Sequence, residues 1–255
     1  MTKDLLTILT TAITNTQATE ELDTIGLLIP YKIKPNSLCY NNPYINLRSI
    51  KRNSSFLLKF GSKLLNQNDS LNGYNISNIE KVVPMLNNHL NLPYFTLETL
   101  LNSQVYWVDV KVDVNNTTNV STEDFISILR DLATTKTNKL ELLEFKREDK
   151  SFIKGIGYNK SLLIKSTCKT VNDSLMIYPK IEEIYNLRHK DPEYYNRFST
   201  EFKIANANLI RFERRLQNSR NIKKAYSLTK TPLLLDILTS SRAVVSQRVH
   251  ELFIN

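Results

Sequence analysis

Glycine, histidine and cysteine are scarce in this chain of 255 residues, and each shortage excludes a class of protein. The five glycines form no Gly-Lys-Ser/Thr motif, and Gly155-Ile-Gly157 lacks the third glycine of a dinucleotide-binding turn. The three histidines are far apart, and neither His-Glu-x-x-His nor Cys-x-x-Cys occurs, which excludes the common zinc motifs. Two cysteines are too few for a disulfide-stabilised scaffold, which predicts a cytoplasmic protein.

Long hydrophobic runs are also missing. No run of about 18 apolar residues occurs, so neither a membrane span nor a membrane partner is expected. The stretch from Leu5 to Ile13 makes a poor signal peptide. A hydrophobic fraction of 41% nevertheless suffices for a sizeable core. Lysine and arginine number 34 against 25 acidic residues, and the resulting charge of +9 makes nucleic acid the first partner to consider.

The hydrophobic patterns predict an α+β protein, with helices on one side of an antiparallel sheet and helices at the C-terminal end. Ser77 with Glu80 and Ser121 with Asp124 are capping boxes that open two helices, and Pro84 predicts a kink in the first. Strands are expected over 25–33, 54–60, 105–114, 139–145, 161–165, 175–178 and 209–216, helices over 1–21, 77–90, 121–132, 179–190 and 219–255, and a loop over 36–46.

Two of the predicted strands alternate apolar and charged residues, so each has one charged face. The charged residues are Asp109, Lys111 and Asp113 on the first strand, and Arg211, Glu213 and Arg215 on the second. If the strands are neighbours, Asp109 and Glu213 can bind one divalent cation, which prefers carboxylate oxygens. The alternative is a solvent-exposed sheet face with cross-strand ion pairs, and the pattern alone favours that alternative.

Tyr178 ends an otherwise apolar strand, and Lys180 follows two positions later. A tyrosine at this place can attack a phosphodiester, because a metal ion and the Lys180 ammonium would favour its phenolate. The alternative is a half-buried tyrosine whose hydroxyl meets water, which is the commoner fate of this side chain.

Basic residues cluster near aromatic ones, a combination that suits single-stranded DNA. The clusters are Lys32 with Lys34, Lys51 with Arg52, Lys59 with Lys63, Arg211 with Arg214 and Arg215, and Arg220 with Lys223 and Lys224. The same clusters are also compatible with an ordinary protein surface.

The order of six short motifs over about residues 23–238 resembles the filamentous-phage replication initiators, the gene II protein family, which is similar in outline to plasmid rolling-circle initiators. The resemblance depends on this order, because no single motif is specific. The motifs are Asp23-Thr-Ile-Gly-Leu-Leu-Ile-Pro30-Tyr, Phe56-Leu-Leu-Lys59-Phe-Gly-Ser-Lys63, Val108-Asp109-Val, Ile177-Tyr178-Pro-Lys180-Ile-Glu182-Glu183, Ile210-Arg211-Phe212-Glu213-Arg-Arg-Leu, and a helical tail from Ile222-Lys-Lys to Leu233-Leu-Leu-Asp.

The resemblance implies a rolling-circle initiator that nicks one strand of its replication origin with Mg²⁺ or Mn²⁺. Tyr178 would be the nucleophile and form a 5′-phosphotyrosyl link, Lys180 would contact the scissile phosphate, and Asp109 and Glu213 would bind the metal. The partners implied are origin DNA and the helicase and polymerase of a bacterial host cell. With the basic clusters, the resemblance predicts DNA contacts at Lys59, Lys63, Lys111, Arg211, Arg214 and Arg215.

We expect four regions along the chain: a helical extension (1–21), an α+β half that binds DNA (22–100), a catalytic α+β half (101–218) and C-terminal helices (219–255). The chain departs from the family at Trp107, which replaces an arginine, and it lacks a His-hydrophobic-His motif, so its metal would depend on carboxylates. Family members continue beyond the equivalent of residue 255, which predicts either a missing C-terminal module or a compact variant.

Tyr185 is a second tyrosine that could take part in religation. Two alternatives from other classes stay open: a non-catalytic protein that binds an origin or operator, and a structural phage protein associated with DNA.

Overall fold

The computed structural model describes residues 20–30, 39–50, 55–65, 69–90, 95–136, 140–144, 161–166 and 172–254. The strands of this part are β1 (Glu21–Pro30), β2 (Cys39–Asn41), β3 (Ile45–Ile50), β4 (Ser55–Gly61), β5 (Gln104–Asn115), β6 (Leu140–Glu144), β7 (Leu162–Ser166), β8 (Asp173–Pro179) and β9 (Leu209–Gln217). Its α-helices are α2 (Val82–Leu90), α3 (Leu97–Leu101), α4 (Thr122–Lys136), α6 (Lys180–Asn186), α7 (Pro192–Tyr195), α8 (Thr200–Ala205), α9 (Ser219–Ala225), α10 (Leu234–Leu238) and α11 (Val244–Val249). Shorter 3₁₀ turns are η1 (Ser62–Leu64), η2 (Ile79–Lys81) and η3 (Leu187–His189), and η4 (His250–Ile254) is a π-helical turn.

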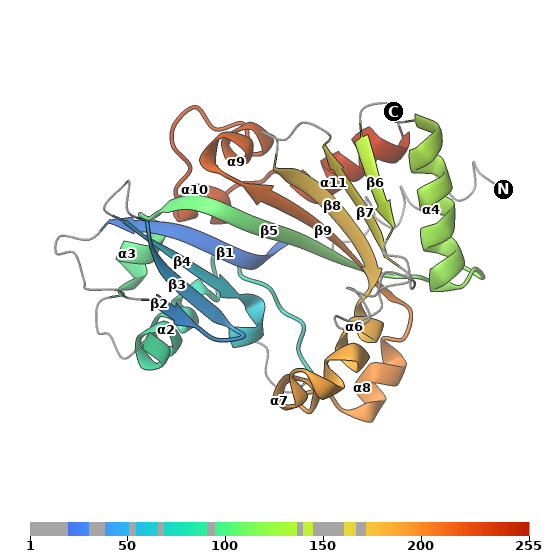
Figure 1. Cartoon of the computed structure of the whole chain (residues 1–255), viewed down its shortest axis with the longest axis horizontal. Helices are drawn as coiled ribbons and strands as arrows, with labels where there is room; N and C mark the ends of the chain where they lie inside the picture. The colour runs from blue at the N-terminus through green and yellow to red at the C-terminus, as the bar shows by residue number, and fades with distance from the viewer. Residues whose placement is uncertain are drawn as a thin grey trace.

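All of these strands form one antiparallel sheet in the order β2-β3-β4-β1-β5-β9-β8-β7-β6 (Figure 1). The central strand β5 pairs with β1 on one side and with β9 on the other. The predicted α+β class, with an antiparallel sheet and a helical C-terminal end, is confirmed. Apart from Glu21, the residues of β1 to β4 belong to the predicted half 22–100, and those of β5 to β9 belong to 101–218. The sheet therefore runs unbroken between the two predicted halves.

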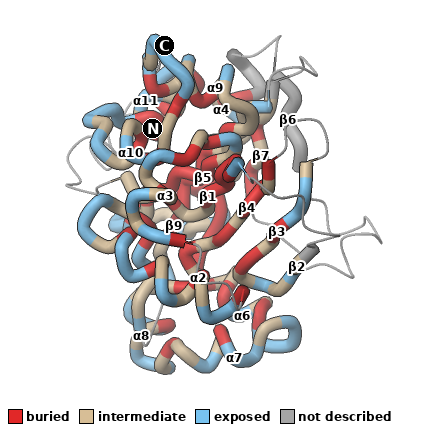
Figure 2. The backbone as a smooth tube through the Cα atoms, turned by 90° about the vertical axis from the view of Figure 1, so that its left-hand side faces the viewer, coloured by how far each residue is buried: buried red, intermediate tan, exposed pale blue. Residues whose placement is uncertain are grey.

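One face of the sheet packs against helices and forms the main hydrophobic core. Helices α9 and α11 contact β5 and β9, and α4 contacts β8. Val108, Val110 and Val112 of β5 are buried there together with Phe212 of β9, and Figure 2 shows the buried residues following the middle strands. Each such side chain stabilises the fold by about 1.5–3 kcal/mol. Because apolar residues alternate with charged ones, their burial directs the charged residues to the opposite face.

A second, smaller hydrophobic cluster lies where the chain leaves β8, around α6, α7 and α8 (Figure 1). Its buried members are Ile181, Ile184, Leu187, Tyr194 and Phe198. Asp191 and Ser199 cap α7 and α8 by accepting hydrogen bonds from backbone N–H groups. The packing fixes the start of α6, which begins directly after the end of β8.

Most predicted strands agree with the structure to within one or two residues. The strands over 54–60, 105–114, 139–145, 161–165, 175–178 and 209–216 are β4, β5, β6, β7, β8 and β9. Strand β1 starts at Glu21 and reaches Pro30, and the rest of the predicted 25–33 strand lies outside the described residues. The predicted N-terminal helix also lies outside them as far as residue 19.

The loop predicted over 36–46 is wrong in part, because it contains β2 and the start of β3. Ile45 and Leu47 are buried in the core, which draws this asparagine-rich stretch into the sheet. The turn between the strands depends on Asn42, whose side-chain oxygen accepts hydrogen bonds from the N–H groups of Tyr44 and Ile45 at 2.8 and 2.6 Å. An Asx turn of this kind explains the local polarity.

One of the two predicted helix starts differs from the structure. Ser121 and Asp124 open α4 as predicted, since the Ser121 hydroxyl accepts a hydrogen bond from the Asp124 N–H at 3.1 Å. The box expected at Ser77 is wrong: the Asn75 side chain accepts hydrogen bonds from the N–H groups of residues 77 and 78, and helical structure begins at Ile79. Pro84 lies in the first turn of α2, where proline is tolerated, so it gives no reason for the kink that the sequence predicts.

Helices α7 and α8 had no sequence prediction, whereas α9, α10 and α11 lie in the predicted C-terminal helical region. No helix within the described ranges is long and apolar enough to cross a membrane.

Candidate active site

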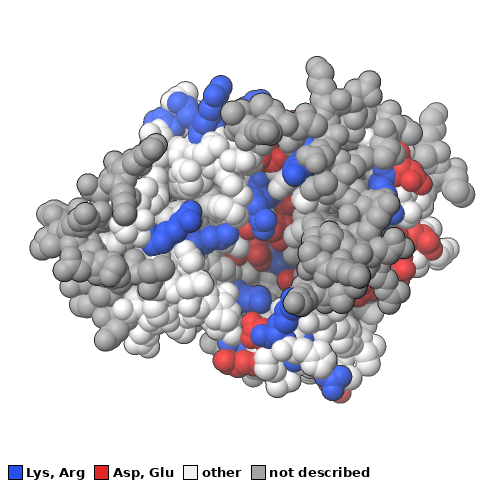
Figure 3. Space-filling model, viewed as in Figure 1, with Lys and Arg blue, Asp and Glu red and all other residues white. Residues whose placement is uncertain are grey.

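Alternate residues of β5 and β9, which carry most of the charge of these strands, lie with Tyr178 of β8 on the face of the sheet opposite the helices α9 and α11. Antiparallel pairing sets Asp109 beside Arg215, Lys111 beside Glu213, and Asp113 beside Arg211. On the other side of β9, Tyr178 of β8 is the register partner of Arg211. Figure 3 shows acidic and basic side chains gathered in a hollow in the middle of this face.

Tyr178 and Glu213 form the centre of the cluster. The Tyr178 hydroxyl donates a hydrogen bond to Glu213 Oε2 at 2.9 Å, and the two residues are only 4% and 5% exposed. Burial raises the pKa of Tyr178 well above its usual value, and the negative charge of Glu213 adds to this effect. Burial, with Asp109 and Asp23 nearby, also raises the pKa of Glu213 to about 7. Glu213 is therefore a carboxylate that can accept a proton near neutral pH.

Arg215 joins the two carboxylates that were predicted to bind metal. Its Nε donates to Asp109 Oδ1 at 2.9 Å, and its Nη2 lies 3.2 Å from Asp109 Oδ2 and 3.3 Å from Glu213 Oε1. The Arg215 side chain is 40% exposed, whereas the carboxylate side chains are buried. Burial raises the pKa of Asp109, and the Arg215 guanidinium opposes that rise.

Trp107 and Lys59 complete the edge of the cluster next to Asp109. The Trp107 indole N–H donates to Asp109 Oδ1 at 2.9 Å. The Lys59 ammonium lies 3.5 Å from the centroid of the Trp107 ring, and the Arg215 guanidinium carbon lies 5.4 Å from it. Such cation–π contacts hold both cations near the ring. Burial lowers the pKa of Lys59, which is the direction expected for an ammonium withdrawn from water.

Arg211 is fully enclosed and binds two aspartates. Its Nε and Nη2 each lie 2.7 Å from the Asp113 carboxylate, and its Nη1 lies 3.0 Å from Asp23 Oδ1. The Ser62 hydroxyl also donates to Asp23 Oδ1, at 2.8 Å. Although burial opposes it, the Arg211 guanidinium holds the pKa of Asp113 far below its usual range. From the sequence, Asp23 is named only as the first residue of a motif and has no predicted role in the site. The pairing of β1 with β5 brings it to Arg211.

Lys111 and Lys180 are buried lysines with carboxylate or carbonyl partners, and neither has a free ammonium on the surface. Lys111 is 3% exposed and lies 3.3 Å from both Glu21 and Asp113, while also donating to the Leu71 carbonyl. Lys180 is 4% exposed, pairs with Glu183, and has its ammonium 5.9 Å from the centroid of the Tyr178 ring. Lys180 is therefore close to the predicted nucleophile, whereas the predicted DNA contact of Lys111 would require it to leave its partners.

Gly73 allows residues 69–74 to lie against this face. A Cβ atom at Gly73 would approach Glu21 Cβ to 2.6 Å and Lys111 Cε to 2.9 Å, too close for any other residue. Glu21 in turn accepts a hydrogen bond from the Gly73 N–H at 2.8 Å. This close approach helps to bury the charged face, so the expected solvent exposure of the face and of Tyr178 is wrong. The cross-strand ion pairs of that alternative are present, as Arg215 with Asp109 and Arg211 with Asp113.

Arg214 lies elsewhere. It belongs to the same side of β9 as Phe212, and its guanidinium binds Asp173 at 3.0 and 2.7 Å and the Val244 carbonyl at 2.7 Å. The predicted grouping of Arg214 with the cluster around Glu213 is therefore wrong, because alternate residues of a strand face opposite sides.

Lys63 and Tyr185 lie outside the group around Tyr178 and Glu213. Lys63 is 3.4 Å from Asp191, and its ammonium is 4.5 Å from the centroid of the Tyr194 ring. Tyr185 is 47% exposed on α6, with its ring 6.3 Å from that of Tyr195. Of the residues predicted for DNA binding, the structure thus brings Lys59, Lys111, Arg211 and Arg215 together with Tyr178, Lys180, Asp109 and Glu213.

The two predicted metal-binding carboxylates are adjacent, but in this arrangement they do not fit a divalent cation. The Arg215 guanidinium already bridges Asp109 and Glu213 and neutralises them. Within the described residues, no three His, Cys, Asp or Glu side chains are grouped so as to hold a metal ion. A cation would need the position that Arg215 occupies, so binding of Mg²⁺ or Mn²⁺ stays a prediction.

Comparison with family models, curated proteins and solved structures finds no match to this chain. Its function is therefore argued from the site itself. The arrangement offers a hydroxyl hydrogen-bonded to a carboxylate of raised pKa, together with two guanidinium groups, the buried Arg211 and the partly exposed Arg215, that can stabilise negative charge. These are the parts that nucleophilic attack on a phosphodiester requires.

Proposed function

We propose that the protein is a rolling-circle replication initiator, which nicks one DNA strand through Tyr178 and stays joined to the new 5′ end. The observation that carries the proposal is the hydrogen bond from the Tyr178 hydroxyl to Glu213, in a cluster of guanidinium and carboxylate groups. The net charge of +9 supports a nucleic-acid substrate. The order of the sequence motifs around these residues supports the replication role.

In the proposed reaction, the Tyr178 oxygen attacks the phosphorus atom as its proton passes to Glu213. The new O–P bond forms while the bond from phosphorus to the 3′ oxygen breaks, and that oxygen takes a proton from solvent. Arg211 and Arg215 offset the negative charge that develops on the phosphate oxygens. The phosphotyrosyl link retains the energy of the broken phosphodiester bond, so religation needs no nucleoside triphosphate.

Access to Tyr178 depends on Arg215 in this proposal. Tyr178 is 4% exposed, whereas Arg215 is the most exposed member of the ion pairs around Glu213. A DNA phosphate offers Arg215 a bidentate partner that can replace Asp109. Substrate binding would thus draw the guanidinium toward the phosphate and open the path to the tyrosine.

The proposed partners are a replication origin, which is single-stranded at the nick, and the host helicase and polymerase that extend the free 3′ end. The proposed setting is the cytoplasm of a bacterial cell. Whether nicking depends on Mg²⁺ or Mn²⁺ is to be measured, and the reaction described above uses no metal ion.

The test is a search for a covalent adduct. The protein is incubated with supercoiled plasmid carrying the DNA that flanks its gene, with and without Mg²⁺ or Mn²⁺, and denatured samples are examined for protein joined to a labelled 5′ end. Tyr178→Phe should form no adduct, and Glu213→Gln should slow it by about 10²–10⁴-fold, as expected when a general base is removed. Tyr185→Phe is the matched control and should form the adduct. An adduct with Tyr178→Phe would overturn the assignment of the nucleophile.

A non-catalytic DNA-binding protein is the second candidate, either an origin or operator binder or a structural protein associated with DNA. The burial of Tyr178 and the closed ion pairs around Asp109 favour it. This candidate predicts DNA binding that weakens steeply with salt and no adduct at any metal concentration. The adduct assay therefore separates the two functions directly.

A further inference from the structure

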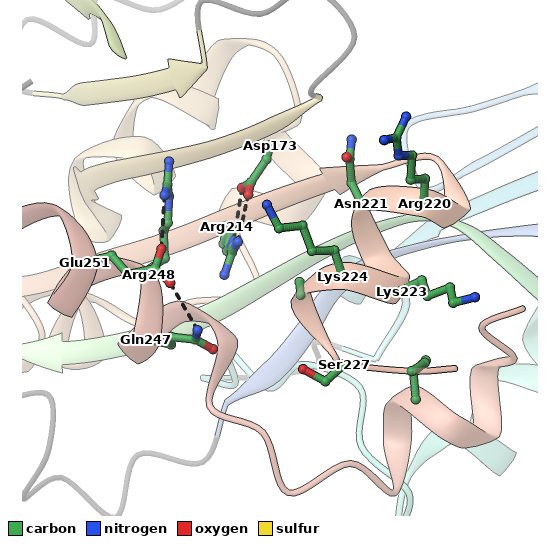
Figure 4. Close-up of a pocket in the computed structure, with 12 residues that line it drawn as sticks. Asp173, Arg214, Arg220, Asn221, Lys223, Lys224, Ser227, Gln247, Arg248 and Glu251 are labelled. Atoms are coloured by element: carbon green, nitrogen blue, oxygen red, sulfur yellow. Dashed lines mark hydrogen bonds and ion pairs between the residues drawn. The ribbon is translucent and has the colours of Figure 1, made fainter. Parts of the chain in front are cut away.

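A basic pocket of about 910 Å³ lies on the helix-covered side of the sheet, away from Tyr178. Its walls come from β8, β9, α9 and the segment of α11 and η4, as Figure 4 shows. Arg214 of β9, which points away from the candidate active site, forms part of its wall.

The charges lining the pocket are unbalanced. They comprise five cations and two carboxylates, a net charge of +3. Arg214 pairs with Asp173 at 2.7 Å, and Arg248 pairs with Glu251 at 3.1 Å. The three remaining cations are Arg220, Lys223 and Lys224. None of these three side chains has a hydrogen bond or ion pair with any described residue.

The three cations are placed together by helix α9. They occupy positions i, i+3 and i+4, which lie on neighbouring parts of a helix surface, while Ile222 is buried beneath them. Arg220 and Lys224 are exposed, and Lys224 points toward the Arg214–Asp173 pair in Figure 4. The paired Arg214 is thus fixed in the wall, whereas the lysines and Arg220 are available to a ligand.

The lining indicates the chemistry of that ligand. Of the residues that line the pocket, Ala225 and Leu228 alone have wholly apolar side chains, and the others carry charged or hydrogen-bonding groups. Asn221, Ser227 and Gln247 add neutral hydrogen-bonding groups among the cations. Several cations with polar neighbours along an open surface match the contacts that proteins make to successive phosphates of nucleic acid.

We propose that this pocket binds the phosphate backbone of a second DNA segment, distinct from the strand at Tyr178. The identity of the polyanion as DNA rests on the proposed function, whereas the pocket and its free cations do not. Duplex DNA beside the nick would be held through Arg220, Lys223 and Lys224. Contacts of this kind position the DNA without reading its sequence.

The expected size of the effect follows from the number of contacts. Each phosphate neutralised on duplex DNA adds about −0.9 to the slope of log affinity against log salt, so three contacts add about −2.7. Between 50 and 200 mM salt, this term alone lowers affinity about 40-fold.

The experiment compares two triple variants that lose the same charge. Arg220→Gln/Lys223→Gln/Lys224→Gln removes the free cations of the pocket, and Lys81→Gln/Lys190→Gln/Lys230→Gln removes three exposed lysines elsewhere. Binding of a labelled 30-base-pair duplex is measured by fluorescence anisotropy from 50 to 200 mM salt. The pocket variant should have a slope shallower by about 2–3, and the control variant a slope close to wild type.

Three outcomes would overturn the proposal: equal losses in both variants, an unchanged slope in the pocket variant, or a pocket that binds a polyglutamate peptide as tightly as DNA. Circular dichroism and melting temperature establish that each variant is folded. Adduct formation on a short single-stranded oligonucleotide tests Tyr178 separately, and the pocket variant should keep it at the wild-type rate. If no protein forms the adduct but the slopes differ as expected, the proposed nicking fails and the pocket stands.

Discussion

Replacing Glu213 by glutamine should make the protein more stable at high pH, because its carboxylate is buried against other negative charges. The folded pKa of about 7 lies above the ordinary 4.5, so folding favours the protonated form. The contribution of Glu213 to the free energy of unfolding is therefore most favourable below about pH 4.5. It falls as the pH rises from about 4.5 to 7, and then levels off. At about 1.4 kcal/mol per pH unit, the charged carboxylate costs about 3 kcal/mol at pH 8 and under about 1 kcal/mol at pH 5.

The glutamine keeps the shape of the side chain but has one oxygen instead of two. It loses one of the hydrogen bonds from Tyr178 and Arg215, at a cost of about 1 kcal/mol. Glu213→Gln should then gain about 2 kcal/mol at pH 8 and be close to neutral at pH 5. Urea denaturation at pH 5, 6, 7 and 8 measures this, with exposed Glu201→Gln as a control that should change by less than about 0.5 kcal/mol. Lower stability at pH 8, or a difference that is the same at all four pH values, would refute this account of the cluster.

Arg211→Met should destabilise the fold by about 3–5 kcal/mol at pH 7, because it leaves the Asp113 carboxylate buried without its partner. The loss should shrink toward pH 4 in urea denaturation, because Asp113, no longer held at a low pKa, takes up a proton there; an equal loss at both pH values would contradict this. Arg215→Ala removes the bridge between two carboxylates, so Mg²⁺ should raise its melting temperature more than that of wild type in a thermal shift assay. Asn218 has φ 65° and caps α9, so Asn218→Ala should cost more free energy of unfolding than Asn218→Gly, which tolerates that backbone; the reverse order in urea denaturation would be inconsistent with strain.

The charged surface of the site could be predicted because its strands are regular. Strict alternation in β5 and β9 places Asp109 and Glu213 on one face, and their strands are indeed neighbours. The same alternation assigns Arg214 to the opposite face with Phe212, so the sequence also predicts that Arg214 lies apart from Arg211 and Arg215.

Burial of the charged face could not be predicted, because alternation is the same for a solvated face and a covered one. The cover depends on residues 69–74, which contact β1 and Lys111 of β5, and on α6, which contacts β9; these contacts join segments distant in sequence. Asp23 was missed for the same reason, since only the pairing of β1 with β5 brings it to Arg211. Strands β2 and β3 were missed because a short strand in a polar stretch leaves little periodicity to detect.

The order of strands in the sheet also has a consequence for folding. Asp23 and Arg211 are 188 residues apart in sequence, yet they form one ion pair, and β5 lies between the first and the last of the described strands, β1 and β9. Such non-local pairing gives a high contact order, which slows folding because long loops must close before the contacts form. During synthesis, β9 leaves the ribosome after all of the other described strands have been made. The carboxylates of β1 and β5 are therefore made before Arg211 and Arg215, and the charged cluster cannot form until β9 has been synthesised.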